Sequence, residues 1–193
     1  MANFLFRYGA MNSGKSTHLM QVAYNYEENG RKVALLKSTI DTKGNDCLVS
    51  RIGLKRKVDY LVSPEASILN LLEPCLSTLS CILVDEVNFM MPSQVEELYL
   101  ITKCYDVPVI CYGLRTDFQT KGFPGSVRCF ELADELEELP TICACGRKAR
   151  LNARKLNGSY VLEGESFEID GADPKLTYEP VCGTCYVKKV WKK

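Results

Sequence analysis

The eight residues from Gly9 to Ser16, Gly-Ala-Met-Asn-Ser-Gly-Lys-Ser, constrain the fold of this chain more than any other feature. They fit the P-loop pattern, in which four residues separate two glycines and the second glycine precedes Lys and Ser or Thr. The apolar and aromatic run from Phe4 to Tyr8 predicts a buried strand directly before the loop. Backbone N–H groups and a helix N-terminus would hold a phosphate there, with Lys15 reaching the β and γ phosphates and Ser16 ligating Mg²⁺.

Strand and helix patterns alternate after the loop. Apolar residues at helical spacing predict a helix that starts after the loop and ends at Gly30, namely Leu19, Val22, Ala23 and Tyr26. Further buried strands are predicted over 32–37, 81–85 and 107–112, and a second helix over 92–105. This order predicts an α/β fold with a mostly parallel sheet and helices on both faces.

Two acidic residues, Asp85 and Glu86, stand at the carboxyl end of the predicted strand 81–85. We expect this strand to lie beside the P-loop strand, so that Asp85 helps to hold Mg²⁺. Glu86 would lie on the other side of the strand end, where a carboxylate can accept the proton of a nucleophile. A P-loop followed by Asp-Glu is common to ATPases and small-molecule kinases, so these residues alone do not name the acceptor.

The ten cysteines fall into two groups. Six are scattered singly and are expected to be small buried apolar residues: Cys47, Cys75, Cys81, Cys104, Cys111 and Cys129. The other four form two close pairs, Cys143/Cys145 and Cys182/Cys185, which is how metal ligands are spaced. Four thiolates are enough for a closed structural Zn²⁺ site, although reduced thiols or a redox pair remain as alternatives.

Composition limits the partners and the location of the chain. Its 24 basic and 24 acidic residues give no net charge, which argues against nucleic-acid binding. No run approaches 18 apolar residues and the start lacks a signal-peptide pattern, so we expect a cytoplasmic protein that does not bind membranes. From residue 141 onward the sequence predicts a small β-rich unit that a metal would stabilise, after a nucleotide-binding domain over residues 1–140.

Four segments together resemble the thymidine kinase family that has a P-loop core and a zinc-bearing lasso. They are Gly9 to Thr17, Asp85-Glu-Val-Asn-Phe89, Tyr112-Gly-Leu-Arg-Thr-Asp-Phe118 and Val181-Cys-Gly-Thr-Cys-Tyr186. The resemblance runs over essentially the whole chain. It implies a RecA-like P-loop fold, a lasso over residues 141–193, and transfer of the γ-phosphoryl group of ATP to the 5′-hydroxyl of thymidine. It also implies feedback by dTTP and a homotetramer.

The resemblance also implies roles for individual residues. Glu86 matches the catalytic base, and Ser16 and Asp85 match the partners of Mg²⁺. The ATP site would comprise Gly9, Ala10, Met11, Asn12, Ser13, Gly14, Lys15, Ser16, Asp41, Lys43, Asp85 and Asn88. The nucleoside site would comprise Phe118, which matches the aromatic stacked on thymine, together with Ser166, Phe167, Glu168, Ile169, Asp170, Gly171 and the lasso tyrosine Tyr178.

The sequence departs from the family pattern at several positions. Lys43 stands where the family has arginine, Asn88 where glutamine is usual, and Asn152 where threonine is expected. One residue instead of two separates Cys143 from Cys145, and about two extra residues precede Tyr178.

Two other classes remain open from the residues alone. One is a P-loop ATPase that moves on nucleic acid with the cysteine tail as a zinc ribbon, and the other is a nucleic-acid-binding module with a structural nucleotide. The lone His18 lies in the predicted helix after the P-loop, where an exposed or core role is expected, so no mechanism that depends on histidine is predicted.

Overall fold

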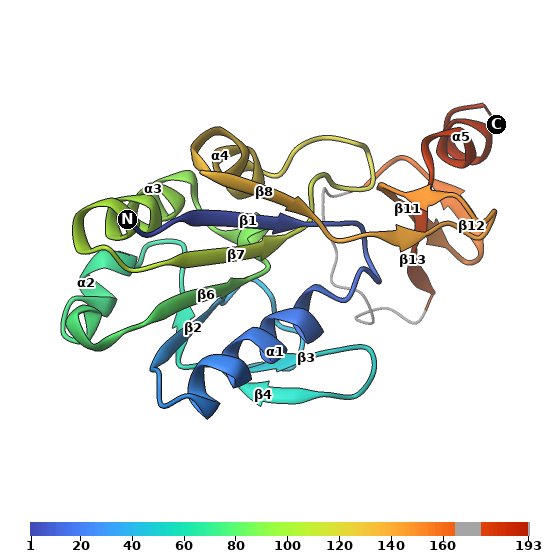
Figure 1. Cartoon of the computed structure of the whole chain (residues 1–193). Helices are drawn as coiled ribbons and strands as arrows, with labels where there is room; N and C mark the ends of the chain where they lie inside the picture. Colours follow the sequence, from blue (N-terminus) through green and yellow to red (C-terminus); the bar gives the residue numbers. More distant parts are fainter. Residues whose placement is uncertain (165–174, 193) are drawn as a thin grey trace.

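A six-stranded parallel sheet forms the centre of the computed structural model, which describes residues 1–164 and 175–192 (Figure 1). Its strand order is β5-β2-β6-β7-β1-β8, and every neighbouring pair is parallel. The strands are β1 (Phe4–Tyr8), β2 (Val33–Ser38), β5 (Tyr60–Val62), β6 (Cys81–Asp85), β7 (Val109–Gly113) and β8 (Glu135–Glu138). Their carboxyl ends meet at one edge, which is where a parallel α/β sheet binds its ligands.

Both faces of the sheet are covered, as the alternating pattern predicts. On one face lie α2 (Ile68–Leu72), α3 (Pro92–Tyr105) and α4 (Pro124–Leu132), whose apolar side chains pack with those of β1, β2, β6 and β7. On the other face lie α1 (Lys15–Glu28) and the antiparallel hairpin of β3 (Cys47–Val49) and β4 (Lys55–Lys57) (Figure 1). Short 3₁₀ turns occupy Leu76–Thr78 and Val87–Phe89.

The predicted elements of the core are confirmed within one or two residues. Strand β1, strand β6 and helix α3 have the expected bounds. Helix α1 stops at Glu28, and Gly30 follows with a φ of 69°, the left-handed conformation that favours glycine after a helix. Strand β7 begins at Val109, just after Pro108, because proline has no N–H to donate to a neighbouring strand.

One expectation about the sheet is wrong. Strand β6, which carries Asp85, does not lie beside the P-loop strand β1, because β7 is placed between them. The P-loop and Asp85 still meet, because β1 and β6 end at the same edge of the sheet and α1 begins there. The hydroxyl of Ser16, at the start of α1, lies 3.2 Å from Asp85 Oδ2.

The tail forms a second, smaller unit of antiparallel strands, as its composition predicts. A two-stranded sheet joins β9 (Thr141–Ile142) and β10 (Lys148–Ala149), and a three-stranded sheet has the order β12-β11-β13. These strands are β11 (Leu151–Leu156), β12 (Ser159–Val161) and β13 (Leu176–Val181), followed by α5 (Gly183–Tyr186) and a π-helical turn over Val187–Trp191. The unit has its own core, in which Cys143, Val181 and Tyr186 are buried.

The scattered cysteines are only partly as expected. Cys81, Cys111 and Cys129 are buried, Cys47 and Cys75 are half-buried, and Cys104 is exposed on α3, so the expectation is wrong for Cys104. Among the described residues, no helix has both the length and the apolar character needed to cross a membrane.

Candidate functional site

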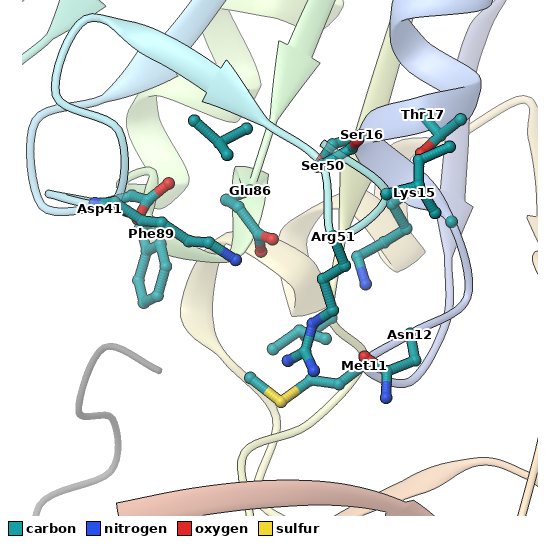
Figure 2. Close-up of a pocket in the computed structure, with 15 residues that line it drawn as sticks. Met11, Asn12, Lys15, Ser16, Thr17, Asp41, Ser50, Arg51, Glu86 and Phe89 are labelled. Atoms are coloured by element: carbon teal, nitrogen blue, oxygen red, sulfur yellow. Dashed lines mark hydrogen bonds between the residues drawn. The ribbon is translucent and has the colours of Figure 1, made fainter. Parts of the chain in front are cut away.

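A pocket of about 370 Å³ opens at the carboxyl edge of the parallel sheet, over the P-loop (Figure 2). The predicted residues that line it are Met11, Asn12, Gly14, Lys15, Ser16, Asp41, Lys43 and Glu86. Figure 2 shows Lys15 from the loop, Glu86 from the end of β6 and Arg51 from the β3–β4 hairpin around one space. With Asp41 and Lys43 from the loop after β2, four separate parts of the chain supply charged groups to the same pocket.

The P-loop has the backbone shape that its glycines allow. Gly14 has a φ of 78° and precedes α1, so the loop turns directly into the helix N-terminus. Gly9 is closely packed, because a Cβ there would lie 2.6 Å from the carbonyl oxygen of Leu139. The predicted loop residues outside the pocket wall are Gly9, Ala10 and Ser13, and the buried Ser13 hydroxyl has no hydrogen-bond partner among the described residues.

The side chain of Lys15 bends back and contacts the backbone of the P-loop. Its Nζ donates to the carbonyl oxygen of Ala10 at 3.2 Å, and the side chain is almost fully buried. Burial lowers the pKa of Lys15, while the charges of Glu86 and Asp85 raise it. The ammonium group therefore sits beside two carboxyl groups at the place where a P-loop lysine meets phosphate.

The two acidic residues differ in their partners. Asp85 is buried and accepts a hydrogen bond from the Ser16 hydroxyl, whereas Glu86 is half-buried in the pocket wall. Burial, with the neighbouring charge of Glu86, raises the pKa of Asp85 to about 7. Burial also raises the pKa of Glu86, against the lowering effect of Lys15. Glu86 Oε2 is a buried atom with no hydrogen-bond partner within the described part of the chain.

Lys37, which the sequence analysis missed, organises the loop that carries Asp41 and Lys43. It is fully buried in β2, and its Nζ lies 3.3 Å from Asp41 Oδ2. The same Nζ donates to the carbonyl oxygens of Lys43, Asn45 and Cys47. A buried ammonium group needs such compensation, and here its partners are the backbone of the loop beside the pocket.

Asn88 is not in the pocket wall. Its Oδ1 accepts the backbone N–H of Leu114 at 2.9 Å, and it is Leu114 that lines the pocket. The pocket also has lining residues that the sequence analysis missed: Thr17, Val49, Ser50, Arg51, Ile52, Phe89 and Leu114. Val49, Ser50, Arg51 and Ile52 come from the β3–β4 hairpin, which carries no motif. Thr17, Phe89 and Leu114 lie in the family-like segments but were not assigned to the site.

Phe118 and Tyr178 lie outside the lining of this pocket. Phe118, in the connection from β7 to α4, is 2% exposed, and Tyr178 belongs to β13. Both contact the guanidinium group of Arg154, a residue that the sequence analysis also missed. The remaining predicted nucleoside-site residues, Ser166 to Gly171, lie outside the described residues.

The four paired cysteines come together in the small unit. The sulfur atoms of Cys143, Cys145, Cys182 and Cys185 all lie within 4.8 Å of one another. Burial raises the pKa of the Cys143 thiol, but hydrogen bonds from the backbone of Cys145 and Cys182 outweigh it and bring the pKa to about 6. The single residue between Cys143 and Cys145 therefore does not prevent a four-sulfur cluster that can hold a metal ion.

Three features together define a P-loop nucleotide-binding protein. They are a parallel sheet with a P-loop before α1, an aspartate that accepts a hydrogen bond from the P-loop serine, and a glutamate in the wall of the same pocket. The thymidine kinase family model matches residues 2–186. The chain therefore belongs to the thymidine kinase family, and it is a kinase.

Individual relatives agree over nearly the whole length. The chain is 44% identical to a thymidine kinase of Chromobacterium violaceum, over 96% of this chain and 98% of the relative. It is 41% identical to a thymidine kinase of Shewanella oneidensis, over 99% of this chain and 100% of the relative. Domain III of the Thermotoga maritima replication initiation protein DnaA covers 74% of this chain and 57% of that structure, with a TM-score of 0.44 and 16% identity, a likeness too low to carry a functional argument.

Proposed function

We propose that this kinase transfers the γ-phosphoryl group of ATP to the 5′-hydroxyl of thymidine, giving ADP and dTMP. Family membership supports the pair of substrates. The observation that carries the chemistry is the unpartnered carboxylate oxygen of Glu86, in the wall of a pocket that also contains Lys15 and the P-loop. A carboxylate that can accept a proton and a phosphate site in the same pocket are suited to phosphoryl transfer to an alcohol.

The phosphate groups of ATP would lie in the P-loop, against its backbone N–H groups and the N-terminus of α1. Lys15 would exchange its contact with the carbonyl of Ala10 for the β and γ phosphates. Lys43 and Arg51, which line the other side of the pocket, add positive charge. Asp41 is held beside them by Lys37, and Asn88 acts through Leu114.

Ser16 and Asp85 would hold the Mg²⁺ that accompanies ATP, since a hydroxyl and a carboxylate are hard oxygen ligands for this ion. Their oxygen atoms lie 3.2 Å apart, close enough to share one ion. When bound, Mg²⁺ neutralises charge that develops on the phosphate oxygens. The burial that raises the pKa of Asp85 is opposed by such a cation.

Glu86 would be the catalytic base. As the bond from the 5′-oxygen to the γ-phosphorus forms and the bond to the β-phosphate oxygen breaks, the hydroxyl proton passes to the carboxylate. Burial raises the pKa of Glu86 and so brings it closer to the operating pH, which favours proton transfer by a carboxylate.

The nucleoside would bind between the parallel-sheet domain, residues 1–140, and the small unit, residues 141–193, acting as a lasso. Phe118 and Tyr178 would present aromatic surface to thymine. The main chain from Ser166 to Gly171, outside the described residues, would hydrogen-bond the base. Closure over the nucleoside would exclude water as a competing acceptor.

The four-cysteine cluster would hold a structural Zn²⁺. Four sulfur ligands close the coordination shell, so the ion would stabilise the small unit and take no part in the chemistry. Feedback by dTTP, assembly as a homotetramer and a cytoplasmic location are further parts of this proposal, based on the family. Neither nucleic acid nor a membrane is proposed as a partner.

The test is product identification after the protein is mixed with Mg-ATP and each of a panel of deoxynucleosides. We expect little ADP without nucleoside, and dTMP with one ADP for each phosphate transferred when thymidine is present. Adding single- or double-stranded DNA in place of thymidine should not stimulate ADP formation. ADP formation that depends on DNA, or that ignores thymidine, would rule out the proposed function.

A further inference from the structure

Arg154 is the largest side chain that is fully buried in the described structure, and it lies against two aromatic residues. Its Nε and Nη2 donate to the hydroxyl of Tyr178 at 2.9 and 2.7 Å. Its Cζ lies 3.7 Å from the ring centroid of Phe118 and 5.4 Å from that of Tyr178. The same guanidinium group thus contacts both aromatic residues that are proposed to meet the nucleoside base.

The local backbone holds Arg154 in this place. Arg154 on β11 and Tyr178 on β13 are paired directly across the small sheet. A buried guanidinium group is costly unless it is hydrogen-bonded and lies over an aromatic ring, and Arg154 satisfies both conditions. Gly164 gives room for it, because a Cβ on Gly164 would lie 2.8 Å from Arg154 Nη1. This arginine is therefore a fixed part of the fold and not a surface side chain.

Phe118 is fixed from two sides by the small unit. The Arg154 guanidinium group covers one face of its ring, and the Tyr186 hydroxyl donates to its carbonyl oxygen at 2.5 Å. A ring has two faces, and at 3.7 Å a planar cation leaves no room for a second flat group on the face that it covers. A base that stacks on Phe118 would have to use the opposite face, which is also covered in this structure because Phe118 is only 2% exposed.

The same face of β11 also contacts the phosphate loop. Asn152 lies two residues before Arg154, and side chains two residues apart on a strand share a face. Its Oδ1 accepts the backbone N–H of Met11 in the P-loop at 2.8 Å. One strand of the small unit therefore contacts both the phosphate site, through Asn152, and the aromatic pair, through Arg154.

We infer that Arg154 is a positioning residue for the nucleoside, which sets the ring of Phe118 and the hydroxyl of Tyr178 for contact with the base. The inference rests on the proposed function and deepens it. The contrary possibility is that the planar guanidinium group occupies the place of the base and has to leave. The two possibilities predict opposite effects of removing the Arg154 guanidinium group. Nucleoside binding weakens if the group positions the site, and it strengthens if the group competes with the base.

The experiment compares the steady-state kinetics of Arg154→Met and Arg154→Lys with those of the wild-type chain. Methionine keeps length and apolar volume but loses the planar cation and both hydrogen bonds, and lysine keeps only the charge. We expect the KM for thymidine to rise about tenfold or more in Arg154→Met and less in Arg154→Lys, with the KM for ATP changed less than about twofold. Tyr178→Phe, which removes only the hydroxyl acceptor, should shift the KM for thymidine in the same direction.

Arg150→Met is the matched control, since Arg150 is an exposed arginine directly before β11 whose Nε lies 3.5 Å from Glu138. It should leave both KM values unchanged. A lower KM for thymidine in Arg154→Met, no change in it, or equal rises in both KM values would overturn the inference. If Arg154→Met fails to fold, Arg154→Lys and Tyr178→Phe carry the same test.

The failures of the two proposals are distinguishable. If the wild-type chain makes no dTMP, the proposed function falls and this inference falls with it. If the wild-type chain makes dTMP and Phe118→Ala raises the KM for thymidine while the Arg154 variants do not, only the inference falls.

Discussion

Asp85 and Glu86 are neighbouring carboxyl groups in surroundings that disfavour their charge. The pKa of both is raised, mainly by burial, and that of Asp85 reaches about 7. The charge of Lys15 compensates the two carboxylates in part, and the proposed Mg²⁺ would compensate them further when ATP is bound. At the scale of single residues, the site therefore costs stability in the absence of ligand.

The first prediction is that Asp85→Asn stabilises the ligand-free protein at pH 8. The folded-state pKa of Asp85 lies above its unfolded value of about 3.9, so the stability linked to its proton is present at low pH and lost as pH rises through about 7. Thermal unfolding should show a melting temperature a few degrees higher for Asp85→Asn at pH 8, with the gain shrinking toward pH 5.

Asp134→Asn is the control of opposite sign. A hydrogen bond from Lys103 lowers the pKa of Asp134, so removing that carboxylate should destabilise the protein at pH 8. An unchanged or lower melting temperature for Asp85→Asn at pH 8 would show that the carboxylate of Asp85 is not strained by its surroundings.

At the scale of elements, the predictable parts of the fold are those with a strong local signal. Strands β1 and β6 and helix α3 are buried apolar runs or have helical spacing, and their bounds follow from the sequence. Strand β8 carries three glutamates in four residues and is held by pairing with β1, so no hydrophobic pattern marks it. The three-residue β5 at the other edge of the sheet is too short for periodicity to detect.

The residues of the site also fall into two groups, those that a local motif marks and those that only tertiary packing brings to the site. Lys15, Ser16 and Glu86 belong to motifs in which spacing along the chain fixes the chemistry. Arg51 and Arg154 reach their positions only through tertiary packing, one at the turn of the β3–β4 hairpin and the other by pairing with β13. No local pattern of residues marks either arginine.

A second prediction concerns the element held by the cysteines. If the four cysteines hold the proposed Zn²⁺, removing it with a strong chelator should unfold the small unit while the parallel sheet stays folded, because some 50 residues with a small core need such a ligand set. Trp191, the single tryptophan, lies 5.6 Å from the ring of Tyr186 in that unit, so its fluorescence reports on the unit alone. Far-UV circular dichroism should retain most of the helical signal.

Cys143→Ser should lose the proposed metal and give the same fluorescence change. Cys104→Ser, at an exposed position on α3, should keep one metal ion for each chain. Metal content measured by mass spectrometry distinguishes the two. A chelator-treated protein with unchanged Trp191 fluorescence would contradict a structural metal.

At the scale of the whole molecule, the parallel sheet carries the P-loop pocket, and the small unit supplies Arg154 and Tyr178 beside Phe118. The two parts touch at the P-loop, where Asn152 accepts the N–H of Met11 and the Thr141 hydroxyl donates to the carbonyl oxygen of Asn12 at 3.2 Å. A movement of the small unit would therefore act on the backbone that is proposed to hold the phosphates. Such a linkage would help one molecule to hold both proposed substrates in position for direct transfer.

The most direct test of this account is phosphoryl transfer from labelled ATP to thymidine by Glu86→Gln, compared with wild type and with Glu96→Gln, whose exposed side chain pairs with Arg128. The glutamine keeps the shape of Glu86 but cannot accept the proton. We predict that kcat falls by roughly 10²–10⁴ with the KM for ATP nearly unchanged, while Glu96→Gln behaves as wild type. Wild-type turnover by Glu86→Gln would contradict the assignment of Glu86 as the base.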